Sequence, residues 1–189
     1  MIRIAVVGDI GSGKSHIANL FGYPVFNADL EVAKMYKTNK SCFKRLKKIL
    51  PKYFSVFPAN KIQIIKAIES SEKNLKKITK IIHPEIRKKL FIFLKKNKKR
   101  KVVILDIPLF LENKLNQNGD IIIFIQSKKL EILKKLRKRK NFNLSVFNKF
   151  KKIQLPLSYK KKKSHFIIKN NFTNNSAKIS IRKILRKIL

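Results

Sequence analysis

Short runs of apolar residues alternate along this chain with longer lysine-rich stretches. Four runs rich in valine, isoleucine and phenylalanine have the length and composition of buried β-strands, and a fifth strand is expected after Tyr23 and Pro24. The predicted strands are Ile2–Val7, Val25–Asn27, Val102–Asp106, Ile121–Ile125 and Phe166–Ile168. Between them, apolar residues recur at helical spacing, as at Ile86, Leu90 and Phe93. This alternation predicts an α/β fold with a five-stranded parallel sheet flanked by helices.

The residues that follow the first predicted strand match the phosphate-binding P-loop pattern G-x-x-x-x-G-K-[S/T]. They run from Gly8 to Ser15 and read GDIGSGKS. A strand precedes them and a helix-compatible pattern follows, which is the geometry that lets backbone N–H groups cradle phosphates. In this pattern, Lys14 reaches the β- and γ-phosphates and the Ser15 hydroxyl ligates Mg²⁺. The sequence therefore predicts that the chain binds a nucleoside triphosphate.

Two aspartates follow predicted strands and are candidates for chemistry. Asp106 ends one strand, where an aspartate of a P-loop protein helps to hold Mg²⁺; we favour this role over a turn or cap because ligands gather at strand carboxyl ends. Asp29 follows the strand at 25–27. A strand lying beside the first one would bring Asp29 near the γ-phosphate, where a carboxylate can accept the proton of a phosphoryl acceptor. Asp29 suits the N-cap of the next helix equally well.

Histidines give weaker signals than the aspartates. His83 and Pro84 lie between two helical patterns, with Arg87 one turn further on, and Pro84 could mark the first turn of a helix. His16 and His165 have no partner at metal-ligand spacing, so we expect no metal cage.

The charge of the chain is extreme, with 47 basic and 10 acidic residues and a formal net charge of +37. Such a charge suits nucleic-acid binding. The lysines are, however, scattered along the whole chain, without a dedicated basic tail. We therefore favour lysines spread over the surface, and expect no specific nucleic-acid partner.

Composition also bears on where the chain works. Cys42 is the only cysteine, which excludes an intrachain disulfide. No apolar run approaches the roughly 20 residues that span a bilayer, and no signal peptide is evident. We expect a cytoplasmic protein without a membrane partner.

Taken together, the motifs resemble those of the dephospho-coenzyme A kinases, and the resemblance covers essentially the whole chain. The P-loop alone is generic, whereas the DIPLFLE block makes the match specific. The matching elements are Gly8–Ser15, Asn27–Asp29, Ile82–Pro84, Asp106–Glu112 and Ile168–Asn170.

The resemblance implies an ATP-dependent kinase that phosphorylates the ribose 3′-hydroxyl of dephospho-CoA, the last step of coenzyme A biosynthesis. It implies that Asp29 is the catalytic base, with Lys14 as the other catalytic residue, and that Mg²⁺ is held by Ser15 and Asp106. The implied ATP-binding residues are Gly8, Gly11, Ser12, Gly13, Lys14, Ser15, His16 and Arg139. The implied acceptor-binding residues are Asp29, His83, Pro84, Arg87, Asp106, Pro108 and Glu112.

By the same resemblance, a P-loop kinase core carries a helical acceptor-binding subdomain and a lid. The core comprises about residues 1–28, 100–129 and 164–189, the acceptor-binding region about 29–98, and the lid about 130–163. ATP and dephospho-CoA are the expected partners, and the expected state is a monomer or weak homo-oligomer.

The chain departs from the family pattern at several positions. His16 replaces a usual threonine, Asn27 a common aspartate, and Lys160, which follows Gln154 at the family's spacing, stands in an arginine place. Lysine cannot copy bidentate arginine contacts. The P-loop and Asp29 are intact, so we expect an active kinase. The alternatives are a nucleoside monophosphate kinase-like enzyme and a nucleic-acid-binding P-loop protein.

Overall fold

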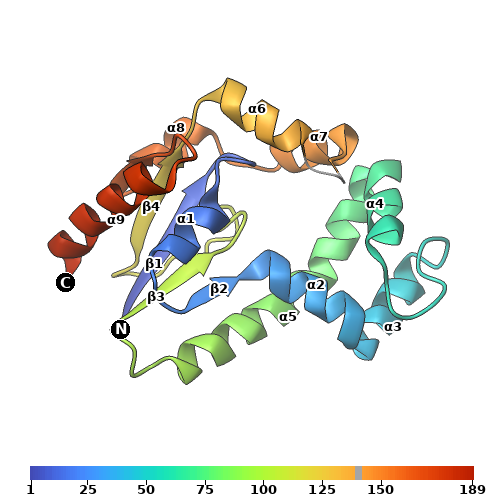
Figure 1. The fold of residues 1–189 in the computed structure, drawn as a ribbon. Coiled ribbons are helices and arrows are strands. Elements are labelled where there is room, and N and C mark those ends of the chain that lie inside the picture. Colours follow the sequence, from blue (N-terminus) through green and yellow to red (C-terminus); the bar gives the residue numbers. More distant parts are fainter. Residues whose placement is uncertain (139–141) are drawn as a thin grey trace. The chain divides into compact units, whose positions relative to one another are not determined.

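A computed structural model describes residues 1–138 and 142–189 of the chain (Figure 1). The five predicted strands are all present, with bounds within one residue of those expected. The strands are β1 (Ile2–Gly8), β2 (Val25–Asn27), β3 (Val102–Asp106), β4 (Ile121–Gln126) and β5 (Phe166–Lys169). The helices are α1 (Lys14–Leu20), α2 (Ala28–Thr38), α3 (Lys40–Ile49), α4 (Lys61–Ser70), α5 (Glu72–Lys96), α6 (Lys129–Arg137), α7 (Leu144–Lys152), α8 (Leu157–Lys162) and α9 (Asn174–Ile188).

The strands form one parallel sheet in the order β2-β3-β1-β4-β5. The α/β prediction is confirmed, but the expectation that the strand before Asp29 lies beside β1 is wrong, because β3 lies between them. All five residues of β3 are buried, as a central parallel strand requires. The three-residue β2 stands at the edge, where a short strand leaves few backbone groups unpaired.

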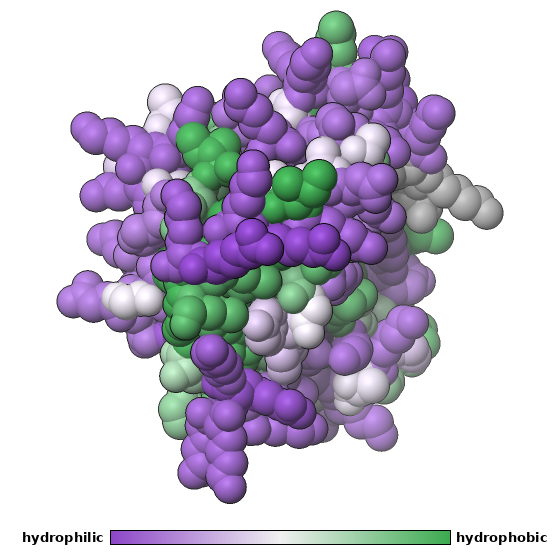
Figure 2. Space-filling view, turned by 60° about the vertical axis from the view of Figure 1, so that its left-hand side comes forward, coloured by the Kyte–Doolittle hydropathy of each residue, from purple (hydrophilic) through white to green (hydrophobic). Residues whose placement is uncertain are grey.

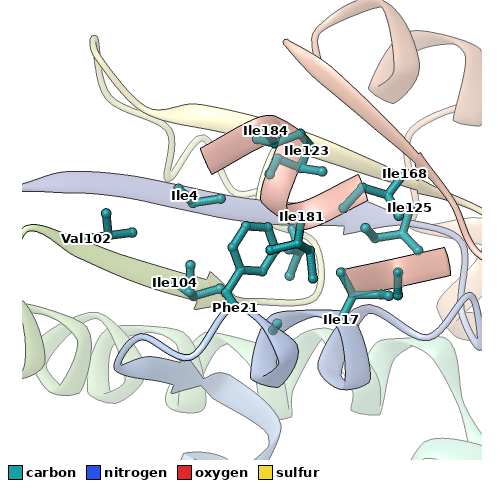
Figure 3. Packing of buried hydrophobic residues seen from close by; sticks show 13 residues of the cluster. Ile4, Ile17, Phe21, Val102, Ile104, Ile123, Ile125, Ile168, Ile181 and Ile184 are labelled. Atoms are coloured by element: carbon teal, nitrogen blue, oxygen red, sulfur yellow. The ribbon is translucent and has the colours of Figure 1, made fainter. Parts of the chain in front are cut away.

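The chain forms two compact units, and the sheet belongs to the first, which comprises Met1–Asn27, Lys96–Phe142 and Ile153–Leu189. Helices α1 and α9 pack on one face of the sheet (Figure 3). Phe21, which directly follows α1, and Ile181 of α9 meet alternate residues of the strands, such as Ile104 and Ile123, because successive strand side chains point to opposite faces. This core fixes the carboxyl ends of the strands, from which the P-loop emerges.

The second unit is helical and comprises Ala28–Lys95 and Asn143–Lys152. Helix α7 is tied to the end of α4 by polar contacts. Lys149 Nζ donates to the carbonyls of Ile68 and Glu69 at 2.7 and 2.6 Å, so that a cation stabilises the carbonyl end of α4. The segment 143–152 of the expected lid thus belongs to the same compact unit as the helical region that follows β2.

Helix α5 runs without a break through Pro84, so the interpretation of this proline as a helix start is wrong. Proline has no N–H to donate to the carbonyl of Lys80 four residues earlier. An apolar stripe on both sides of Pro84 holds the helix together despite that loss. Its buried residues are Leu75, Ile78, Ile81, Ile82, Ile86 and Leu90.

Hydrophilic side chains cover most of the face of the molecule in Figure 2 and surround a group of hydrophobic residues at the left of its centre. This is the surface expected when lysines are spread along the whole chain. Throughout residues 1–138 and 142–189, every helix is too short or too polar to cross a membrane.

Candidate functional site

The P-loop connects β1 to α1 in a backbone conformation that only glycine adopts without strain. Gly11 and Gly13 have φ angles of 83° and 90°. A Cβ atom on Gly11 would lie 2.9 Å from Leu136 Cγ of α6, and one on Gly13 would lie 2.5 Å from Asn170 Nδ2. The glycines predicted from the motif are therefore required by both φ and space.

Two side chains from neighbouring strand ends hold the loop in this shape. The Ser127 hydroxyl and Asn170 Nδ2 each donate to the carbonyl of Ser12, both at 2.9 Å. Asn170 is almost fully buried, and its Oδ1 accepts from the backbone N–H of Phe172 at 2.9 Å. Neither residue was assigned a role from the sequence. The available signal was their position, since each directly follows a strand of the sheet.

Lys14 and Ser15 of the motif and Asp106, the candidate at the end of a strand, come together at the carboxyl ends of β1 and β3. Burial raises the pKa of Asp106, while a hydrogen bond with Ser15 and the charge of Lys14 act in the opposite direction. Asn27 Nδ2 donates to Asp106 Oδ2 at 2.6 Å. Lys14 Nζ donates to the carbonyls of Asp9, at 2.6 Å, and Gly8. A hydroxyl, a carboxylate and a cation thus meet beside the phosphate loop.

The turn after β3 brings further predicted residues to a pocket that also contains Gly8 and Lys14 of the P-loop. Leu109 lies in the left-handed region with a φ of 59°, and Phe110 is fully buried. Glu112 Oε1 accepts from the backbone N–H of Leu155 at 3.0 Å and lies 2.7 Å from Lys160 Nζ. The pocket is lined by Val7, Gly8, Lys14, Ile107, Pro108, Leu109, Phe110, Glu112, Gln154 and Lys160.

Another hollow lies in the second unit, along one face of α5. It contains the three predicted residues His83, Pro84 and Arg87, together with side chains one and two turns earlier. Burial, and then the charge of Arg87, lower the pKa of His83. A neutral histidine beside an arginine can donate and accept hydrogen bonds while the arginine binds an anion. The lining residues are Lys76, Thr79, Lys80, His83, Pro84 and Arg87.

Asp29 is the second residue of α2 and is exposed. It lies within the first turn of the helix, so the N-cap alternative is wrong. The positive end of the helix dipole favours a negative charge at this place. The residue before the helix, Asn27, belongs to the first unit, whereas Asp29 belongs to the second.

Two predicted ATP contacts remain to be placed. His16 Nε2 lies 2.8 Å from Asn174 Oδ1 at the start of α9, so its ring contacts another part of the first unit. Arg139 lies outside the described residues. Within the described ranges, no group of three or more His, Cys, Asp or Glu side chains is arranged to hold a metal ion.

Comparison with known proteins supports the assignment that the motifs suggested. A family model described as dephospho-CoA kinase matches residues 2–176. A dephospho-CoA kinase of Wolbachia pipientis is 32% identical over 170 residues, which cover 87% of each chain.

Solved structures show the same fold. The Thermus thermophilus protein TT1252 superposes with a TM-score of 0.81 at 24% identity, covering 100% of this chain and 97% of its own. A dephospho-CoA kinase from Campylobacter jejuni superposes with a TM-score of 0.64 at 24% identity, covering 98% and 96%.

Proposed function

This chain belongs to the dephospho-CoA kinase family, and we propose that it transfers the γ-phosphoryl group of ATP to the ribose 3′-hydroxyl of dephospho-CoA, giving CoA and ADP. The observation that carries the proposal is the family match across residues 2–176, which includes the P-loop and both strand-end aspartates. ATP and dephospho-CoA are the substrates that this activity requires.

The P-loop supplies the donor side of the reaction. Its backbone N–H groups would bind the β- and γ-phosphates, and Lys14 would exchange its contacts with the Gly8 and Asp9 carbonyls for phosphate oxygens. The clamp of Ser12 by Ser127 and Asn170 keeps the loop in one conformation. A preorganised loop stabilises the charge that develops during transfer without first having to rearrange.

The residues at the strand ends fit Mg²⁺. The Ser15 hydroxyl and the Asp106 carboxylate are hard oxygen ligands in mutual contact, and Mg²⁺ in kinases takes few protein ligands because phosphate oxygens and water complete its shell. We infer that these two residues would hold the ion. Held there, Mg²⁺ would neutralise negative charge on the phosphates. Asn27 orients the Asp106 carboxylate through its amide.

The acceptor side is assigned to the helical unit. We infer that Asp29 accepts the proton of the ribose hydroxyl as the new O–P bond forms and the bond from the γ-phosphorus to the ADP oxygen breaks. Its place two residues after Asn27 supports this role. His83 and Arg87 on α5 offer a hydrogen-bonding group and a cation suited to the phosphates of dephospho-CoA.

The decisive experiment is a direct assay of the purified chain with ATP and Mg²⁺. Dephospho-CoA should give ADP and a product that phosphorus NMR identifies as 3′-phosphorylated. AMP and other nucleoside monophosphates, offered at the same concentration, should give little turnover. Preferential phosphorylation of a monophosphate, or no transfer to dephospho-CoA, would overturn the proposal.

A further inference from the structure

Helix α9 presents to solvent a face on which every charged side chain is positive. Its buried residues, among them Ile181 and Ile184, pack on the sheet, while its basic side chains are all exposed. Figure 1 shows α9 on the side that Figure 2 turns toward the viewer, where hydrophilic side chains cover most of the surface. This basic face of α9 consists of Lys178, Arg182, Lys183, Arg186 and Lys187.

No acidic side chain compensates these charges. All ten acidic residues of the chain lie within the described ranges, and none is in α9 or in α1, which packs beside it on the same face of the sheet. Exposed lysines elsewhere do have acidic partners. Lys34 pairs with Glu31 in α2, and a similar pair joins Lys134 to Glu131 in α6. Among the described residues, none of the five on the basic face takes part in such a pair.

This arrangement of charge opposes the stability of the helix. Residues four apart are neighbours on a helix surface, so Arg182 repels both Lys178 and Arg186. The helix dipole favours cations only in the last turn, which accounts for Arg186 and Lys187 but not for the basic residues before them. Folding of the helix therefore gives no reason for an exposed face with five like charges.

The basic face has the charge and the length to bind the phosphate backbone of a nucleic acid. From Lys178 to Lys187 the helix rises about 13 Å, a length over which a duplex carries about eight phosphates. Only eight of the 47 basic residues are arginines, yet two lie one turn apart here, and arginine can bind phosphate through two parallel N–H donors. A membrane fits less well, because an interfacial helix buries its apolar face in lipid, and that of α9 already packs on the sheet.

We propose that the basic face of α9 binds the phosphate backbone of a duplex nucleic acid without reading its bases. The five residues are distinct from those assigned to ATP and to dephospho-CoA, so this binding is a property of the chain beyond phosphoryl transfer. Contacts with phosphates carry no sequence information, in keeping with a chain for which no sequence-specific nucleic-acid partner is expected. Such contacts release counterions, so the binding weakens steeply as the salt concentration rises.

Two double variants test the proposal, since each removes two positive charges from an exposed helix surface. Arg182→Gln with Arg186→Gln changes the basic face, and Lys34→Gln with Lys134→Gln removes lysines that have acidic partners. The probe is a fluorescein-labelled duplex DNA of mixed sequence and about 20 base pairs, whose binding is followed by anisotropy between about 50 and 200 mM KCl.

The arginine variant should bind this DNA about tenfold more weakly than the original chain. The slope of log K against log salt should become less steep by about 1.8, the contribution of two phosphate contacts. The lysine variant should keep the original slope. Equal losses in the two variants, or no loss in either, would show that DNA responds only to the charge of the whole surface and would overturn the proposal.

The melting temperature of the arginine variant should equal or exceed that of the original chain, because the change removes like charges from neighbouring positions. Its loss of DNA binding would then come from the missing contacts and not from unfolding. Saturating ATP with Mg²⁺ should leave the DNA bound to the original chain. Displacement of the DNA by ATP would place it on the P-loop and contradict the proposal.

Vesicles of phosphatidylglycerol and phosphatidylcholine in equal parts test the membrane as the alternative partner. Sedimentation should show little binding of the original chain to these vesicles. Tight binding to the vesicles that the arginine variant loses, together with unchanged binding of DNA, would assign the basic face to a lipid surface and overturn the assignment to nucleic acid.

Discussion

The two compact units hold their candidate residues in different ways. In the first unit, which carries the P-loop and is called the phosphate-binding unit below, the loop glycines have no room for a Cβ atom, and Asp106 is buried among polar partners. In the helical unit, Asp29 and Arg87 are exposed on helices whose opposite faces form the packing surface. The candidate site of the first unit thus consists of backbone groups and buried side chains. The candidate residues of the second unit are exposed side chains on helices that pack through their opposite faces.

This difference decides what a substitution can report. A change in the P-loop alters packing and chemistry together, because the same atoms serve both. A change on an exposed helix face removes a functional group and leaves the core intact. Substitutions in the helical unit therefore test the role of a side chain in the reaction without changing stability. Substitutions in the phosphate-binding unit test how closely its atoms are packed around the P-loop.

The largest effect is expected for Asp29→Asn in the helical unit. Loss of the general base should lower kcat about 10²- to 10⁴-fold, while ATP affinity and the melting temperature stay near their original values because Asp29 is exposed. Steady-state kinetics, nucleotide titration and thermal melting measure the three quantities. Glu31→Gln, in the same first turn of α2, is the matched control and should retain activity. Near-normal turnover of Asp29→Asn would remove Asp29 as the base.

A glycine pair tests how tightly the phosphate-binding unit is built. Gly13 and Gly119 have similar φ angles, 90° and 87°, but only Gly13 lacks room for a Cβ atom. Alanine at either position should destabilise the fold by about 1–2 kcal/mol, because its backbone has a positive φ. Any additional loss of stability at Gly13 therefore measures the steric clash of the added Cβ atom. Gly13→Ala should unfold at a lower temperature than Gly119→Ala, and it alone should lose ATP affinity, because a displaced Asn170 no longer holds Ser12. Equal melting temperatures of the two variants would show that the P-loop and Asn170 can shift to accommodate the added Cβ atom at little cost in stability.

The features that sequence predicted well are local ones. The strands are short apolar runs, and the P-loop residues are fixed by spacing within eight positions, so Lys14 and Ser15 were found without the fold. The order of strands depends on pairing across the chain. The three residues of β2 do not indicate that this strand lies at the edge of the sheet. The position of Asp29 relative to β1 could therefore not be predicted from the sequence.

The missed residues have the same cause. Ser127 and Asn170 act only because two strand ends meet at the loop. Lys160 is one of four consecutive lysines, and its burial depends on where α8 meets the turn after β3. Pro84 carries a local signal for a helix start, but the apolar stripe extends on both sides of it, and tertiary packing overrides the local preference.

A smaller effect is expected for Arg87→Met on α5. The arginine is exposed, so its removal should leave the fold unchanged and raise the KM for dephospho-CoA roughly tenfold, as expected for one charge-assisted contact. The kcat and the KM for ATP should stay within about twofold. Lys88→Met removes an adjacent exposed cation outside the hollow and is the control. A parallel rise in both KM values would indicate a general effect of charge and contradict a specific acceptor contact.

The smallest effect concerns the stability of the phosphate-binding unit and its dependence on pH. Burial raises the pKa of Asp106 in the folded chain. The folded protein therefore holds this proton at pH values where the unfolded chain has released it, so the carboxyl favours folding at low pH and this contribution is lost as the pH rises through the folded-state pKa. Asn in its place has no such dependence.

The melting temperature of Asp106→Asn, measured without nucleotide or Mg²⁺, should accordingly rise relative to the original chain as the pH increases from about 4 to 7. The difference in melting temperature should therefore be largest at the neutral end of this range. Glu131→Gln, on the exposed face of α6, removes the same charge without burial and should show little such trend. A constant difference across this range would mean that the polar partners of Asp106 fully compensate the effect of burial on its pKa, and it would contradict the prediction.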